Sequence, residues 1–272
     1  MLAKVLRQIL VPDCRDLDLT LLTTLSDQKL YEEKKKAPPT ESEIYRSSQI
    51  GKLCPREEVL KWKYQVHSME AYSPKTKRIF DIGNAFNDLI QNKWFGEWGW
   101  LIGDWDCTNC HTCYRFQKRP EKCEKCSGKK FTYIELYFED HKFGVSGHPD
   151  GIIELPSGQK RLLELKTCNS QVYSFLINIR KRPLEAHLDQ ISLYQWKYDL
   201  ELASVIYLNK DTSDWIEFLV RRDEWRIQNI FRKLHQIRDG MKGNTIPKRE
   251  ICSDKTCARA RACSVRKQCF SC

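Results

Sequence analysis

Alternating apolar and polar positions predict a strand-turn-strand unit near the middle of the chain. Residues 143–155 are rich in apolar and β-branched side chains, residues 156–158 (Pro-Ser-Gly) are typical of a turn, and residues 160–167 resume the strand pattern. Because side chains alternate along a strand, Glu164 and Lys166 would project from one face of this β-hairpin. The leucines between and before them would project from the other face, into a core.

This hairpin would bring two carboxylates and an ammonium group together. Asp150 and Glu164 would lie on neighbouring strands, close to Lys166. Mg²⁺ or Mn²⁺ prefers such hard oxygen ligands. The two carboxylates, together with the backbone carbonyl of Leu165, would leave coordination positions of the ion open for water and a phosphate. The ion would polarise the phosphoryl oxygen and activate water, while Lys166 stabilises charge. The pattern therefore predicts a metal-dependent phosphodiesterase, with an ordinary surface hairpin as the alternative.

A helical pattern follows the hairpin. Residues 186–200 predict a helix in which His187, Gln190 and Tyr194 line one face at three- and four-residue spacing. That face can meet the predicted site. The alternative is that Tyr194 simply packs in the core with the apolar residues around it. Residues 181–183, just before this helix, are a phosphate contact or a solvated loop.

The thirteen cysteines favour metal sites over disulfides. Their number is odd and no secretory signal is recognisable, so we expect a reducing, cytoplasmic compartment in which clustered cysteines bind metals. No apolar run approaches the length of a membrane span, so no membrane partner is expected.

Two cysteine pairs have the spacing of a zinc ribbon. Cys107 and Cys110 form one pair and Cys123 and Cys126 the other, separated by twelve residues. Four protein ligands would close the coordination shell, so this Zn²⁺ would be structural. Cys113 is a rival for one position in the first pair. We expect the ribbon to be an insertion over residues 104–130.

Composition and charge fit a nucleic-acid-binding globular protein. The 272 residues are 41% hydrophobic and 30% charged, which suits one α/β domain with attachments. Residues 1–40 would comprise an N-terminal helical segment of about thirty residues and a charged, proline-stopped linker over residues 32–39, which divides this segment from the rest. The net charge of +10 indicates a polyanionic partner such as nucleic acid.

The motifs resemble the RecB-like branch of the PD-(D/E)XK nuclease superfamily. The resemblance rests on Gly-x-x-Asp ending at Asp150, on Glu-x-Lys at 164–166, and on Gln-x-x-x-Tyr at 190–194. Residues 52–56 and the C-terminal cysteines are similar to iron-sulfur exonucleases of CRISPR-associated and phage type, relatives of the AddB nuclease domain. The resemblance covers about residues 42–270, and it assigns residues 41–272 to the nuclease domain.

This resemblance implies a fold and an activity. The fold would be a restriction-endonuclease-like α/β core with a mixed central sheet flanked by helices. It would carry the ribbon and an iron-sulfur subdomain that joins the N- and C-terminal segments. The activity would be that of a Mg²⁺- or Mn²⁺-dependent exonuclease on single-stranded DNA ends. Gln190 would orient the catalytic lysine or a phosphate, and Tyr194 would pack beside it or stack on a base.

The family places a metal-binding histidine where this chain has Asn87. Gly83, Asn87 and Gln91 recur every four residues and would share one helix face. Because hard metals accept amide oxygen, Asn87 can bind the ion directly or through water, more weakly than the family's ligand. A solvated helix position is the alternative.

The resemblance also nominates a [4Fe-4S] cluster. Its ligands would be Cys54, Cys252, Cys263 and Cys269, with Cys257 as the rival of Cys252. Residues 245–272 together with Cys54 would form the iron-sulfur subdomain. The alternative is a second zinc site, since thiolate quartets hold either metal.

The expected function is that of a deoxyribonuclease in a bacterial, archaeal or phage-infected cell. Its partners would be DNA and a helicase, a recombinase or CRISPR adaptation proteins. Because Asn87 departs from the family, a second reading is a catalytically weakened DNA-binding iron-sulfur and zinc module. It would act as a partner subunit of a helicase or recombinase.

Overall fold

The computed structural model describes residues 26–30, 44–66 and 73–271. The chain divides into two compact units, one of Met1–Thr40 and Met69–Ile82, the other of Glu41–Ser68 and Gly83–Cys272. The described part of the first unit consists of a helical segment at residues 26–30 and the first part of helix α5 (Pro74–Asp88). The rest of the predicted N-terminal helical segment and linker lies outside the described residues.

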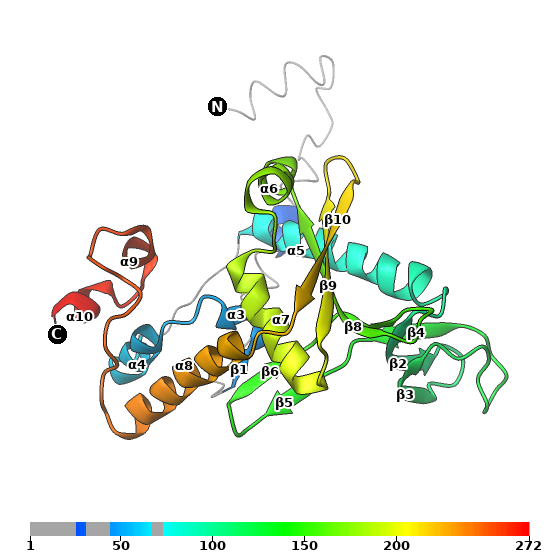
Figure 1. The fold of residues 1–272 in the computed structure, drawn as a ribbon, viewed down its shortest axis with the longest axis horizontal. Coiled ribbons are helices and arrows are strands. Elements are labelled where there is room, and N and C mark those ends of the chain that lie inside the picture. The colour runs from blue at the N-terminus through cyan, green and yellow to red at the C-terminus, as the bar shows by residue number, and fades with distance from the viewer. Residues whose placement is uncertain (1–25, 31–43, 67–72, 272) are drawn as a thin grey trace, which may run out of the picture. The chain divides into compact units, whose positions relative to one another are not determined.

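A seven-stranded mixed sheet forms the centre of the second unit (Figure 1). The strand order is β10-β9-β8-β7-β2-β3, and β4 pairs with β2 beyond the end of β7. Strands β8 and β9 run parallel, and the other neighbours in this sheet are antiparallel. The strands are β2 (Leu101–Cys107), β3 (Cys113–Lys118), β4 (Phe131–Ile134), β7 (Gly151–Glu154), β8 (Lys160–Cys168), β9 (Leu202–Asn209) and β10 (Trp215–Arg221).

Helices connect the parallel strands and cover the sheet. The chain leaves β8 through α6 (Ser170–Phe175) and a π-helical turn, η2 (Leu176–Arg180), and returns along α7 (Glu185–Tyr198). Parallel neighbours need such a crossover because the chain must return to the same end of the sheet. Helix α8 (Glu224–Lys242) packs against α7 and begins at Asp223, whose carboxylate accepts the N–H of Arg226.

Each face of the sheet has its own hydrophobic core. One core joins β8 and β9 to α7 and α8 through residues such as Leu162, Ile191 and Ile230. The opposite core contains Leu163 and Leu165, packed with residues of β2, β4 and the π-helical turn η1 (Leu89–Trp94). The alternation predicted for residues 163–166 is therefore present, and the mixed sheet flanked by helices confirms the expected α/β class.

The predicted hairpin needs one correction. Residues 143–155 are two strands in different sheets, because the chain breaks at His148 and at Pro149, which has no N–H to donate. Strand β6 (Val145–Gly147) pairs with β1 (Tyr45–Arg46) and β5 (Phe138–Asp140) in a small three-stranded sheet. The remaining part, β7, forms the hairpin with β8 as predicted.

The C-terminal segment packs on helix α4 (Pro55–Lys63). Proline suits the first turn of a helix, because the N–H that it lacks would have no partner within the helix. Leu60 of α4 forms a small separate core with Val265 and Cys269, next to the short helices α9 (Ala258–Ala262) and α10 (Arg266–Ser271). Among the described residues, no helix combines the length and the apolar character that crossing a membrane requires.

Candidate active site and cysteine clusters

Asp150 is fixed by backbone and side-chain hydrogen bonds at the entry to β7. Its carboxylate accepts the N–H of Leu165 at 2.5 Å and the amide of Asn87 at 3.3 Å. Its backbone carbonyl accepts the side-chain amide of Gln91 at 2.8 Å. Gly147 makes this tight entry possible, because a Cβ there would lie 2.5 Å from the hydroxyl oxygen of Ser47. The carboxylate is therefore held beside the middle of β8.

Glu164 and Lys166 share the face of β8 that is turned toward α7. The Glu164 side chain is 1% exposed and forms an ion pair with the Lys166 ammonium group. Its second oxygen, Oε2, is buried and has no hydrogen-bond partner among the described residues. A buried charged oxygen without a partner is costly, and such an oxygen is a ready ligand for a cation.

The electrostatics of this site show an excess of negative charge. Burial, and then the charge of Glu164, raises the pKa of Asp150 well above its usual range. Burial likewise raises the pKa of Glu164, although the Lys166 charge opposes this effect. For Lys166, burial alone would lower the pKa, but the two carboxylates outweigh burial and raise it. The lysine is therefore a permanent cation and not a free general base.

The donor atoms fit a hard divalent cation. The N–H and C=O groups of a strand residue point to the same edge of the strand. Because the Leu165 N–H donates to the Asp150 carboxylate, the Leu165 carbonyl points to the edge on which Asp150 lies. The site thus offers the carboxylates of Asp150 and Glu164 and a backbone oxygen, the ligand types that Mg²⁺ and Mn²⁺ prefer.

Asn87 lies next to Asp150, as the helical pattern predicts, but it presents its amide nitrogen. The Nδ2 group donates to Oδ1 of Asp150 at 3.3 Å, so the oxygen would face a bound ion only after the amide rotates. One turn later, Gln91 lies within η1 and still faces the site, since it bonds both Asp150 and Glu135.

Glu135 is an acidic neighbour that sequence reasoning missed. Its carboxylate accepts the Gln91 amide at 3.0 Å, and its charge contributes to the raised pKa values of Asp150 and Glu164. It follows β4, in a stretch without a recognisable motif. Only the pairing of β4 with β2 brings it to the site, so no local spacing signals it.

Tyr194 and Gln190 hold the loop that carries Asp150. The Tyr194 hydroxyl donates to the backbone carbonyl of His148 at 3.0 Å, hydrogen-bonds Ser47 at 2.6 Å, and accepts the Gln190 amide at 3.2 Å. Stacking of Tyr194 on a base does not fit its 1% exposure, so the core-helix alternative describes it better. The hydrogen bond of Gln190 is likewise with Tyr194 and not with Lys166.

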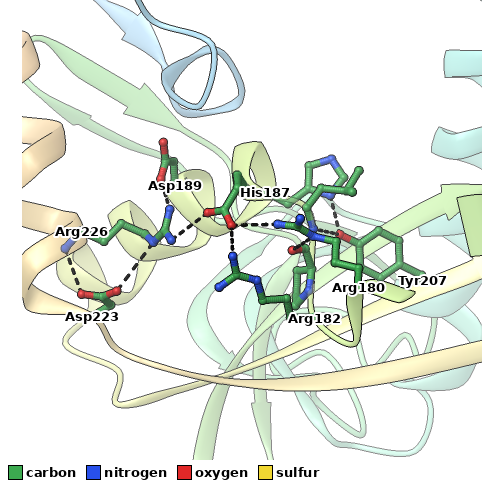
Figure 2. A network of polar contacts seen from close by, with 10 residues as sticks. Arg180, Arg182, His187, Asp189, Tyr207, Asp223 and Arg226 are labelled. Carbon is green, nitrogen blue, oxygen red and sulfur yellow. Dashed lines mark hydrogen bonds and ion pairs between the residues drawn. The ribbon is translucent and has the colours of Figure 1, made fainter. Parts of the chain in front are cut away.

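The start of α7 is anchored by a polar network on the same side of the sheet (Figure 2). His187 hydrogen-bonds the Tyr207 hydroxyl of β9 at 2.6 Å, and Arg226 of α8 reaches Asp189 at 2.5 Å. Arg182, which the sequence offered as a phosphate contact, forms an ion pair with Glu185 of α7. These contacts fix the helix that positions the Asp150 loop.

The four predicted zinc ligands come together. The sulfur atoms of Cys107, Cys110, Cys123 and Cys126 all lie within 4.8 Å of one another, and this cluster can hold a metal ion. Two of the separations are 3.6 Å, close to the roughly 3.8 Å between sulfurs at tetrahedral angles and 2.3 Å from zinc. Cys113, the rival ligand, lies on β3 outside this group.

Tight turns and a tyrosine surround the four-cysteine cluster. His111 and Ser127 each take a left-handed conformation and donate a backbone N–H to the carbonyl of Cys107 and Cys123, respectively. The hydroxyl of Tyr114 donates to the Cys123 sulfur at 3.3 Å, and this bond is the main cause that lowers the pKa of Cys123 to about 6. The N–H of Gly128 lowers the pKa of Cys126, but the bond to Cys110 and burial outweigh this effect and instead raise that pKa to about 12. A thiolate is the form that binds metal.

The four cysteines assigned to an iron-sulfur cluster line one cavity. Cys54, at the N-terminus of α4, lies across it from Cys252, Cys263 and Cys269 of the C-terminal segment, whereas Cys257 is not part of the lining. Cys257 instead caps α9, where its sulfur accepts the N–H of Ala260 at 3.4 Å.

The surroundings of this cavity suit an anionic metal cluster. Burial, together with the bond to Cys257, raises the pKa of Cys252 to about 11, so cations are needed to hold its thiolate. Arg56 donates to the Cys269 sulfur at 3.3 Å, and the arginines at 249 and 259 also line the cavity. Glu57 and Glu250 also line the cavity, and Arg259 pairs with Glu57 at 2.6 Å, so Arg56 is the arginine whose bond to a cysteine sulfur fits an iron-sulfur cluster of net negative charge.

Comparison with known proteins finds distant structural likenesses. No protein-family model and no curated protein matches the sequence. The chain resembles the crystal structure of SSO0001, with 16% identity and a TM-score of 0.46, over 91% of this chain and 98% of that one. It also resembles LHK-Exo in complex with dAMP, with 11% identity and a TM-score of 0.44, over 80% and 94% of the two chains. A third likeness, at 11% identity and a TM-score of 0.43 over the same shares, is to the alkaline exonuclease LHK-Exo from Laribacter hongkongensis. At these values the likenesses assign no activity to this chain.

Proposed function

We propose that this chain is a metal-dependent nuclease that hydrolyses phosphodiester bonds in DNA, as an exonuclease on single-stranded ends. The observation that carries the proposal is the buried Oε2 atom of Glu164, which has no partner among the described residues. It lies in one site with the carboxylate of Asp150 and the ammonium group of Lys166. A surface hairpin would expose these groups, and it would not leave a carboxylate oxygen buried and unpaired.

Each side chain has a role in this proposal. Asp150, Glu164 and the Leu165 carbonyl would hold Mg²⁺ or Mn²⁺, with Asn87 as a weaker ligand. When bound, the ion would polarise the scissile phosphoryl group and offset its negative charge. Lys166, which stays protonated, stabilises the charge that develops in the transition state. Tyr194 positions Asp150 through the His148 carbonyl.

The two cysteine clusters would support this core. In the proposal, Cys107, Cys110, Cys123 and Cys126 bind a structural Zn²⁺ within a ribbon over residues 104–130. Cys54, Cys252, Cys263 and Cys269 bind a [4Fe-4S] cluster that ties residues 245–272 to α4. Residues 41–272 are then one nuclease domain. The preference for DNA ends, and a helicase, a recombinase or CRISPR adaptation proteins as partners, are inherited from the motif resemblance.

Hydrolysis of end-labelled single-stranded DNA tests the activity. Wild-type protein with verified iron and zinc content should degrade the DNA in Mg²⁺ or Mn²⁺. Asp150→Ala should reduce the rate by about 100- to 1,000-fold, as expected when a group that stabilises the transition state is removed. Glu154→Gln is the matched control, because Glu154 ends the strand that Asp150 precedes but pairs with Lys118 at the surface. A rate that survives Asp150→Ala would exclude the proposed site.

The second function is a DNA-binding module with weakened catalysis, acting with a helicase or recombinase. The contact that favours it is the donation from the Asn87 amide to Asp150, which occupies an oxygen that a metal would use. Wild-type protein that binds the same DNA but leaves it intact in both ions would support this reading. Asn87→His should then restore hydrolysis, whereas Asn87→Ala should not.

A further inference from the structure

Among the residues that the structure describes, strand β10 forms an open edge of the central sheet. It pairs with β9 on one side, over seven residues without a bulge, and lies last in the strand order. An open edge presents unpaired N–H and C=O groups, and proteins usually protect such edges with proline, lysine or a bulge. Residues 215–221 contain no proline, lysine or bulge, and their charged side chains are Glu217 and Arg221.

The register shows which residues offer their backbone groups outward. The N–H of Arg222 donates to the carbonyl of Glu201, and the N–H of Asn209 donates to the carbonyl of Asp214, so even-numbered residues of this strand bond to β9. Because the bonding edge alternates along an antiparallel pair, Glu217, Leu219 and their odd-numbered neighbours point their N–H and C=O away from β9.

The side chains of these odd-numbered residues are exposed. Leu219 is 54% exposed and Trp215 is 47% exposed, which is unusual for large apolar side chains on a strand edge. Arg221 has no ion-pair partner among the described residues. Glu217 forms a loose pair with Arg161 at 3.7 Å. The edge therefore combines free backbone groups, an apolar centre and one charge of each sign.

The side chains of this edge are complementary to those of the same edge in a second, antiparallel copy of the chain. If two copies of β10 pair antiparallel with Leu219 opposite Leu219, then Glu217 of each copy lies opposite Arg221 of the other. Opposite charges in directly opposing positions stabilise a strand pair, and two apolar side chains would meet at the twofold axis. On the other sheet face, Phe218 would meet Val220 of the second copy.

The neighbouring registers are less favourable. Centring the pair on Glu217 would place two carboxylates opposite each other, which is destabilising. Centring it on Phe218 would place Glu217 opposite Leu219 and leave the carboxylate without a partner. The charge pattern thus selects the register centred on Leu219.

Space is available beside the edge. A groove runs along β10 and is lined by Phe218, Leu219 and Val220, by Leu188 of α7, and by basic residues that include Arg182 and Arg226. We propose that β10 is a dimerisation edge, through which a second copy of this chain extends the central sheet across a twofold axis. This inference is independent of the nuclease activity.

Charge reversal tests the interface. Analytical ultracentrifugation of the full chain should show a dimer. Glu217→Arg and Arg221→Glu should each weaken the dimer about tenfold or more, because two attractive pairs become repulsive. The double variant should restore dimerisation, and this restoration also shows that the single variants had not simply misfolded. A wild-type chain that stays monomeric, or a dimer insensitive to both reversals, would refute the proposal.

Cross-linking tests the register. Directly opposed residues in a hydrogen-bonded pair lie about 5.5 Å apart at Cα, a separation that a disulfide can span. Mild oxidation of Leu219→Cys should give a covalent dimer joined at position 219 in both copies. Glu217→Cys is the matched control and should not cross-link, since its two copies would lie four residues apart. Cross-linking of the control alone, or of neither variant, would contradict the predicted pairing.

Discussion

At the scale of single residues, the site is defined by an imbalance of charge in a buried place. Asp150 and Glu164 contribute two carboxylates, and Lys166 contributes one ammonium group. The burial that raises both carboxyl pKa values would make the ionised pair unfavourable without another cation. The divalent ion of the proposed function would supply the positive charge that this burial leaves lacking.

The anchoring histidine gives a prediction about pH. Burial, followed by the charges of Lys166 and Lys52, lowers the pKa of His187 to about 4. Because the folded state favours neutral His187, its contribution to stability is full above the unfolded pKa of about 6.5. That contribution is lost as the pH falls from there toward 4.

Comparison with His187→Gln isolates this effect. Between about pH 7 and about pH 5, wild type should lose roughly 1–2 kcal/mol more unfolding free energy than the variant. Urea unfolding at each pH measures the difference, and NMR titration of the imidazole gives the pKa directly. An imidazole that titrates near 6.5, with equal losses in both proteins, would contradict the predicted burial of this ring.

At the scale of elements, short segments depend on partners far away in the sequence. The loop before β7 is held by Tyr194 of α7 and Ser47 of α3 (Ser47–Ile50). The C-terminal helices α9 and α10 have few residues, and their core with α4 consists mainly of Leu60, Val265 and Cys269. Elements this short are not stable alone, so the proposed cluster would supply much of their folding free energy.

Removing the proposed iron-sulfur cluster should therefore unfold this region locally. Hydrogen exchange of protein treated with an oxidant and an iron chelator should show that backbone protection in residues 245–271 falls by about 100-fold or more. Protection of β8 and β9 should stay unchanged, because their core is separate from that of the C-terminal segment. Cys54→Ser should reproduce the loss. Unchanged protection in residues 245–271 would show that no cluster stabilises them.

At the scale of the whole molecule, the central sheet connects the candidate active site to the rest of the second unit. Strand β8 carries Glu164 and Lys166 and pairs with both β7 and β9, so it cannot move without breaking both core faces. An ion bound between β8 and the Asp150 loop would bind the folded state and not the unfolded chain. Its binding free energy would therefore add to the stability of the whole unit.

Metal linkage tests this coupling. In the proposed site, Mn²⁺ at about 100 times its dissociation constant should raise the unfolding free energy of wild type by about 2.7 kcal/mol. Asp150→Asn should show little or none of this increase, since one ligand is weakened while the side-chain volume is kept. Chemical unfolding with and without Mn²⁺ measures both. Equal stabilisation of the two proteins would place the bound ion elsewhere.

The sequence by itself determined features that depend on local spacing. The ribbon cysteines lie in two pairs, each within one tight turn, so their spacing alone predicted a cluster that the structure shows. The hairpin of β7 and β8 and the alternation along β8 were predictable for the same reason, because periodicity and turn residues act over a few positions.

Only the tertiary structure decided the features that need contacts between distant segments. Glu135 reaches the site because β4 pairs with β2, and Tyr194 became a positioning group because α7 packs over the loop at His148. The break between β6 and β7 and the outward-facing backbone of β10 also follow from which strands become neighbours. Strand pairing across many residues is set by the packing of the whole core, so no short sequence pattern contains it.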